Sequence, residues 1–204
     1  MALAGKVGAV YVQTSAAPVA FLDEATTANA AYTRYTITNA TKRYWYKNTA
    51  VTVKKNSVVQ TTGFTIEYTG GVVVFDTPLL DTDVVVVSGS YLTVAQSGGF
   101  FNWSADTGAD MSDITTFASN GWKEVQPTVK EWSGSAEAFW GDSSFFDKLG
   151  TEVVVVLYMD AGAAKYRFEG FAIITGDGIE ANVDDVVQES IDFQGVGPLY
   201  YREN

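Results

Sequence analysis

Apolar and polar residues alternate along most of the chain in short segments, the pattern of half-buried β-strands. Unbroken apolar runs at 84–87 and 153–157 instead predict strands that are covered on both faces. The predicted strands are 5–12, 31–37, 51–55, 57–60, 64–68, 72–75, 84–94, 152–159, 164–174 and 185–194, and a further alternating segment ends in aromatic residues at 139–140. The pattern therefore predicts a mainly β protein.

Turn-forming residues punctuate these segments. Asn56 predicts a tight turn, and 69–71, 160–163 and 176–178 predict further turns between strands. One short α-helix is predicted over 142–149, because Asp142 and the two serines after it offer N-cap oxygens. Phe145, Phe146 and Leu149 would form its apolar stripe, and Gly150 would end it.

The chain has 204 residues, enough for one sizeable β domain or a domain with an insertion. Its composition and charge change near 96–99. We expect an N-terminal strand and arm at 1–30, a hairpin-rich elaboration at 31–95, and a β-sandwich core with the short flanking helix at 96–204. No apolar run is long enough to cross a membrane, and the first residues do not resemble a secretory signal.

The chain contains neither Cys nor His. This composition removes thiol nucleophiles, disulfides, the usual zinc ligands and His-dependent catalytic triads. It also fits a cytosolic site of synthesis.

The net charge of −11 is unevenly distributed. Residues 1–100 carry 7 basic and 6 acidic side chains, whereas residues 101–204 carry 6 basic and 18 acidic side chains, for a net −12. The C-terminal half is therefore expected to repel nucleic-acid phosphates, although such charge also serves as ordinary solubilising surface.

A local basic stretch contrasts with that acidity. No acidic residue lies between Ala25 and Ile66, where tyrosines and Trp45 are interleaved with six basic residues. Those residues are Arg34, Lys42, Arg43, Lys47, Lys54 and Lys55. Basic side chains among aromatics occur on nucleic-acid surfaces. The alternation favours a half-buried strand with aromatics on one face.

Two candidate sites contain carboxylates. Asp106, Asp110 and Asp113 lie close together, but their spacing differs from the EF-hand pattern and suits turns and caps better than calcium. Glu131 and Glu137 could form a glycosidase pair beside a sugar platform of Trp122, Trp132 and Trp140. On one strand the two carboxylates would be about 20 Å apart, too far for that chemistry. We therefore expect no catalytic residue, metal or cofactor.

Four pieces of the C-terminal half carry a family resemblance. They are Asp113-Ile-Thr-Thr-Phe117, Gly121-Trp122, Trp132-Ser-Gly-Ser-Ala136 and the segment 188–197. In this order, together with a short helix and terminal strands, they resemble the tail tube (major tail) proteins of long-tailed bacteriophages. The resemblance covers roughly 99–197, with a weaker similarity at 5–12.

The resemblance implies a non-enzymatic virion protein with a β-sandwich fold. Its subunits would form hexameric rings that stack into a tail tube, and DNA would pass through the lumen during ejection into the host without specific binding. The partners would be other copies, the tape measure and the terminator, with no membrane. The implied stacking residues are Asp113, Ile114, Thr115, Thr116, Phe117 and Trp122.

Acidic side chains on the long strands would then line the lumen and repel phosphates. The candidates are Glu131, Glu137, Glu169, Glu189 and Asp192. The basic stretch is expected to lie away from the lumen. The alternative function is a carbohydrate-binding or host-surface adhesion β-sandwich, which clustered exposed aromatics with Asp and Asn would support.

Overall fold

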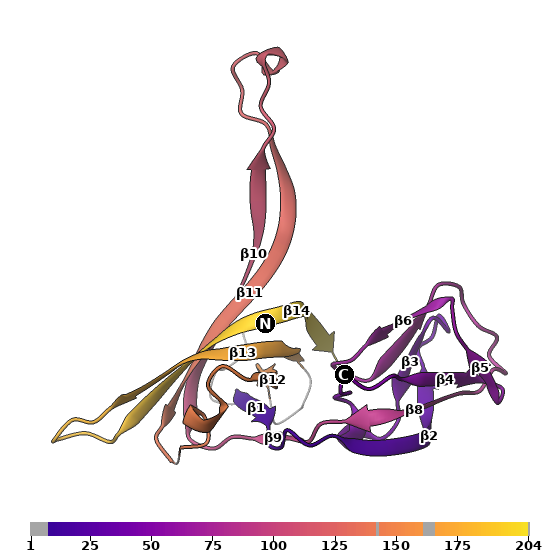
Figure 1. The fold of residues 1–204 in the computed structure, drawn as a ribbon, viewed down its shortest axis with the longest axis horizontal. Helices are drawn as coiled ribbons and strands as arrows, with labels where there is room; N and C mark the ends of the chain where they lie inside the picture. Colours follow the sequence, from indigo (N-terminus) through magenta and orange to yellow (C-terminus); the bar gives the residue numbers. More distant parts are fainter. Residues whose placement is uncertain (1–7, 142, 161–165, 204) are drawn as a thin grey trace. The chain divides into compact units, whose positions relative to one another are not determined.

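The computed structural model describes residues 8–141, 143–160 and 166–203 (Figure 1). Most of these residues lie in strands, which confirms the prediction of a mainly β protein. The strands are β1 (Ala9–Gln13), β2 (Val19–Ala28), β3 (Arg34–Ile37), β4 (Thr52–Lys55), β5 (Val58–Gln60), β6 (Phe64–Glu67), β7 (Val72–Phe75), β8 (Val85–Tyr91), β9 (Val94–Gln96), β10 (Phe100–Asp113), β11 (Val125–Phe139), β12 (Glu152–Tyr158), β13 (Tyr166–Glu180) and β14 (Gln188–Glu203). The 3-10 helices are η2 (Ala40–Lys42), η3 (Phe117–Ser119) and η4 (Phe146–Lys148).

The strands form two seven-stranded sheets. One has the order β10-β11-β14-β13-β12-β1-β9, and the other has the order β5-β4-β8-β2-β3-β7-β6. The chain also divides into two compact units, one built mainly from Ser97–Val153 and Leu157–Asn204 and the other mainly from Tyr11–Gln96. The pairs β10–β11, β11–β14, β13–β14 and β2–β8 are antiparallel.

The unit around Tyr11–Gln96 has its own core. In its sheet, β2 lies between β8 and β3 and pairs with both. The first part of β2 pairs with β8 and its last part pairs with β3, with a register shift between Phe21 and Glu24. Asp23, inside that shift, has a φ of 48°, a left-handed conformation that Asp tolerates better than most residues. The core contains Phe21, Tyr35, Ile37, Trp45, Val53, Val73, Phe75, Val85 and Val87.

The hairpin turns predicted in this unit are confirmed. Asn56 and Ser57 join β4 to β5 with φ values of 49° and 68°, and two positive φ values are what a type I′ turn requires. Gly70 and Gly71 join β6 to β7, also with positive φ. A side chain at Gly71 would meet the Ile37 side chain at 2.7 Å, so this turn needs glycine for space as well as conformation.

The predicted helix over 142–149 is a single 3-10 turn. Asp142 lies outside the described residues, and η4 spans Phe146–Lys148. Leu149 has already left the helical conformation, with φ −55° and ψ 130°. A segment this short forms too few hydrogen bonds to offset helix nucleation, so good capping residues do not extend it. Phe145 is nevertheless buried, with its ring 5.7 Å from that of Phe100.

The predicted turn at 176–178 is wrong, since these residues lie inside β13. Gly176 and Gly178 pair with Asp192 and Ser190 of β14. A Cβ at Gly176 would lie 3.0 Å from a carboxylate oxygen of Asp192, and one at Gly178 would lie 2.9 Å from the Ser190 hydroxyl. These glycines therefore make room for polar side chains of the neighbouring strand.

Candidate assembly surface

A two-stranded ribbon extends from the edge of the β10–β14 sheet (Figure 1). β10 and β11 pair from Phe100 to Asp113, but β14 pairs with β11 only from Ser133 to Phe139. From Val125 to Trp132, β11 therefore pairs with β10 alone. Nearly every residue from 106 to 131 is exposed. An isolated two-stranded ribbon is marginally stable in water, so this segment lacks the cover that strands usually have.

The ribbon exposes large apolar side chains along both strands and at its tip. Phe117 is 109% exposed and Trp122 is 79% exposed. The others are Met111, Ile114, Val125 and Val129, which are between 46% and 64% exposed. Contiguous apolar exposure of this kind marks an interaction surface. The outer edge of β10 is not paired with another strand, and β10 carries three charged residues, Asp106, Asp110 and Asp113, but no Pro, Lys or Arg.

Short-range hydrogen bonds hold the tip loop. The backbone amide of Thr115 donates to Asp113 Oδ1 at 2.9 Å, and the Glu124 amide donates to Thr115 Oγ1 at 2.9 Å. Hydrogen bonds from the Thr115 hydroxyl and from its backbone amide lower the pKa of Asp113 below its ordinary value. Thr116 and Ser119 cap η3 reciprocally. Polar groups thus fix the loop while Phe117 remains in solvent.

The base of the ribbon has one polar face and one buried face. Side chains of β10, β11, β13 and β14 that share the polar face are Asn102, Ser104, Asp106, Glu131, Ser133, Ser135, Glu137, Ser190, Asp192 and Gln194, with Gly108, Gly176 and Gly178 between them. Asn102 donates a hydrogen bond to Glu137 at 3.0 Å, and the hydroxyl oxygens of Ser104 and Ser135 lie 3.1 Å apart. The side chains named here include four carboxylates and no Lys or Arg.

Three of the five predicted lumen acids lie on this polar face: Glu131, Glu137 and Asp192. Glu189 lies on the other face, opposite Ala138, and is only 4% exposed. Glu169 is completely buried. Both residues are buried in the subunit, so the expectation that they line the lumen is not carried into the proposal below. Neighbouring residues on a strand point to opposite faces, which separates Glu189 from Asp192.

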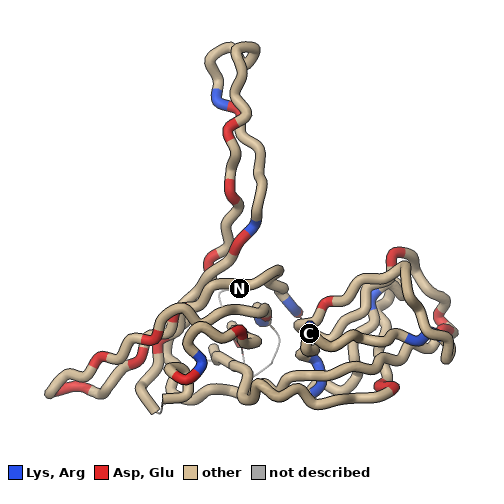
Figure 2. The backbone as a smooth tube through the Cα atoms, in the orientation of Figure 1, with Lys and Arg blue, Asp and Glu red and all other residues tan. Residues whose placement is uncertain are grey.

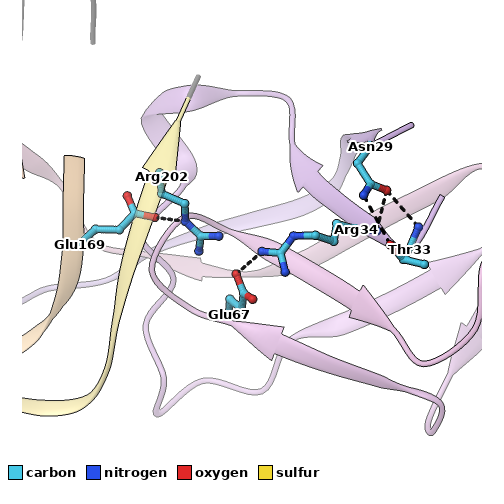
Figure 3. A network of polar contacts seen from close by, with 6 residues as sticks. All are labelled: Asn29, Thr33, Arg34, Glu67, Glu169 and Arg202. Atoms are coloured by element: carbon cyan, nitrogen blue, oxygen red, sulfur yellow. Dashed lines mark hydrogen bonds and ion pairs between the residues drawn. The ribbon is translucent and has the colours of Figure 1, made fainter. Parts of the chain in front are cut away.

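Glu169 instead joins two arginines of β13 and β14. Arg167 Nε donates to one of its oxygens at 3.0 Å. Arg202 Nε donates to the other at 2.7 Å, a contact that Figure 3 shows. Arg167 and Arg202 face each other across the strand pair. Their like charges would repel without Glu169 between them. The arrangement is therefore a structural ion triad that ties the end of β14 to β13.

On the buried face, Trp132 occupies a space that two glycines leave. A Cβ at Gly195 would lie 2.2 Å from its indole ring, and one at Gly170 would lie 2.6 Å from it. The Trp132 ring also meets Phe193 edge-on, with ring centres 6.1 Å apart. Trp132 is 3% exposed, whereas Trp140 just beyond the end of β11 is 45% exposed.

These positions separate the three tryptophans of the proposed sugar platform. Trp122 precedes β11 and Trp140 follows it, and the strand has 15 residues. At about 3.3 Å per residue the two rings lie at opposite ends of a strand about 50 Å long. Trp132 between them is buried, so the three residues do not form one carbohydrate platform.

Three of the six basic residues in the stretch 34–55 pair with acids from elsewhere in the same unit. Arg34 contacts Glu67 at 2.6 Å (Figure 3), and Lys54 contacts Asp23 at 2.7 Å. Lys42 pairs with Glu24. These acids lie before and after the basic stretch in the sequence. Pairing between strands brings them next to the basic side chains, so the sequence alone did not show the ion pairs.

Among the described residues, no group of three or more Asp or Glu side chains is arranged to hold a metal ion. Asp106, Asp110 and Asp113 are spread along β10 and do not converge.

In the part of the chain that the structure describes, no helix is long and apolar enough to span a membrane.

No protein-family model matches the chain, and no curated protein matches it. Solved structures resemble part of it, and two of them are chains of gene transfer agent particles. One is a chain from the tail of an empty gene transfer agent (GTA) particle with C6 symmetry, at 17% identity and a TM-score of 0.42, covering 53% of this chain and 86% of that chain. The other is a chain from the virion of a native GTA particle, at 18% identity and a TM-score of 0.42, covering 53% and 88%.

Proposed function

We propose that this protein is the structural subunit of a phage-type tail tube. Its copies would assemble into hexameric rings, and the rings would stack into a hollow conduit for DNA ejection. The protein would be made in the host cytoplasm and reside in the virion tail, with the tape measure and terminator proteins as further partners. The family resemblance of residues 99–197 supplies the hypothesis. The uncovered β10–β11 ribbon is the observation that carries it.

The ribbon supports an assembly role because its exposed apolar residues need a partner. Aromatic side chains bury about 150–250 Å² each when covered, so docking Phe117 and Trp122 would remove several hundred Å² of apolar surface from water. We assign the contact between rings to the tip residues Asp113 to Phe117 and Trp122. The unpaired edge of β10 offers a second contact, to a strand of a neighbouring copy, and closed ring symmetry would leave no such edge free.

The polar face supports the proposed lumen. Asp106, Glu131, Glu137 and Asp192 give it negative charge without a counterion on the same face. A surface of this kind makes no counterion-releasing contact with phosphates, so DNA could slide along it without being held. In this proposal residues 96–204 form the tube core, residues 1–30 contribute an N-terminal arm, and 31–95 form an elaboration away from the lumen.

The test is electron microscopy of the purified protein with size-exclusion chromatography. We expect rings and tubes. A deletion of residues 112–120 should leave a folded protein that does not elongate, and Phe117→Ser with Trp122→Ser should do the same. The matched control is Val58→Ser with Val59→Ser, two exposed apolar residues of β5. A stable monomer at all concentrations would refute the tube, and long tubes from the deletion variant would refute the placement of the contact.

A further inference from the structure

A second exposed aromatic surface lies at the opposite end of the same strand pair. Phe101 is 50% exposed and Phe139 is 47% exposed, and their rings are 5.0 Å apart. Trp140 follows directly and is 45% exposed, and Phe146 of η4 is 63% exposed. We call Phe101, Phe139, Trp140 and Phe146 the aromatic base. Surface aromatics in this number mark a contact that a partner covers.

The tip of a chain cannot reach the aromatic base of the same chain. β10 starts at the base with Phe100 and ends at the tip with Asp113, and β11 returns from Val125 to Phe139. Strands of 14 and 15 residues at about 3.3 Å per residue hold the two surfaces about 45 Å apart. The strands pair along this whole length, so the chain cannot fold back on itself without breaking them.

One basic side chain at the tip could pair with acidic side chains beside the base. Lys123 directly follows Trp122 and is the one basic side chain of residues 113–124, which also contain Asp113 and Glu124. The last residue of β13, Glu180, and the turn residues Asp184 and Asp185 are acidic, and no Lys or Arg occurs from 168 to 201. Figure 2 shows this hairpin end with acidic residues only. The turn adjoins the base, because Phe139 pairs with Gln188 and the Trp140 amide donates to the Val187 carbonyl at 2.9 Å.

We propose that the ribbon tip of one copy docks on the aromatic base of a second copy, with Lys123 facing the acidic β13–β14 turn. Phe117 and Trp122 would pack against the base aromatics. Such a contact joins two different surfaces, so each added copy leaves one tip and one base free. Head-to-tail contacts of this type extend without limit unless rotation closes them. This inference rests on the proposed function and names the receiving surface for its stacking contact.

Site-directed cross-linking can test the contact, because the chain has no Cys of its own. Ala118→Cys places a thiol at the exposed tip beside Phe117. Gly141→Cys places one beside Trp140, where a new Cβ meets no atom within 4 Å. Neither change removes an aromatic residue. Val59→Cys, on exposed β5 of the other unit, is the matched control.

Oxidation of an equal mixture of the Ala118→Cys and Gly141→Cys proteins should give a cross-linked dimer. The protein that carries both changes should give a ladder of dimers, trimers and longer products. Ala118→Cys mixed with Val59→Cys should stay uncross-linked. Dimers from Ala118→Cys alone, or equal cross-linking to Val59→Cys, would overturn the proposal.

A charge exchange gives an independent readout. Lys123→Glu should raise the protein concentration needed for assembly roughly two- to fivefold, the range for one exposed ion pair. Asp184→Lys with Asp185→Lys should restore assembly of that variant. Tubes without the tip-to-base cross-link and without this rescue would refute the docking surface but leave the tube proposal standing. A protein that never associates would refute both.

Discussion

The indole Nε1 of Trp132 donates a hydrogen bond to the backbone carbonyl oxygen of Gly197, 3.0 Å away. The contact joins β11 to β14, 65 residues later in the chain. In the reverse direction, the Gln194 side-chain amide donates to the Trp132 carbonyl oxygen at 2.9 Å. Trp132 lies at the point where β11 leaves β14 and enters the two-stranded ribbon. It therefore anchors the ribbon to the sheet.

Replacing Trp132 with Ala should lower the free energy of unfolding by about 3–5 kcal/mol, the usual cost of deleting a buried aromatic residue. The glycines at 170 and 195 leave no side chains to fill the resulting cavity. Urea denaturation followed by circular dichroism measures the effect. Trp122→Ala is the matched control, because this tryptophan is 79% exposed. If both changes cost the same, Trp132 is not the anchor.

Replacing Glu169 with Gln should lower the free energy of unfolding by about 3–5 kcal/mol, since it leaves two largely buried arginines without their shared counterion. Thermal and urea denaturation provide the measurement. Glu131→Gln on the exposed polar face should change stability by less than about 0.5 kcal/mol. Equal stability of Glu169→Gln and the wild type would show that the triad does not hold β14.

The tip loop should loosen in acid. The pKa of Asp113 is lowered in the folded protein, so its carboxylate stabilises the loop fully above the ordinary value of 3.8. That stabilisation is lost as the pH falls through the lower, folded value. An NMR titration of the Asp113 carboxyl and the Thr115 amide follows this change. Thr115→Val removes the hydroxyl donor and should move the pKa of Asp113 back toward 3.8; an unchanged pKa would contradict the assigned cause.

Positive charge on the polar face should make the assembled protein retain DNA. Glu131→Lys with Glu137→Lys should give tubes whose DNA binding falls steeply as salt rises, because lysines in the lumen would release phosphate counterions. Gel-shift or filter-binding assays across a salt series measure this. Asp76→Lys with Asp81→Lys makes the same change in charge on exposed residues of the other unit and should have less effect. Equal binding by both variants would place the polar face outside the lumen.

Local patterns predicted the hairpins well. The β4–β5 and β6–β7 hairpins and the Val-rich strands β8 and β12 lie where alternation and turn residues placed them. Their signals are contained within a few neighbouring residues. β2 and β10 escaped prediction: β2 is mostly exposed, and β10 is a polar segment with little alternation in burial. A strand that is solvent-exposed on both faces has no period-2 pattern to detect.

The sequence by itself determined that the chain is mainly β, that it lacks His and Cys chemistry, and that its acidic half contains the segment with Phe117 and Trp122. The tertiary structure alone decided which acids of different strands share a surface. Glu131, Glu137 and Asp192 meet on one face, whereas Glu169 is buried between Arg167 and Arg202. The face of the sheet on which a side chain lies depends on strand register and on bulges, such as the shift between Glu169 and Phe171. Register is set by pairing between strands that are distant in sequence, so no local pattern of residues encodes it.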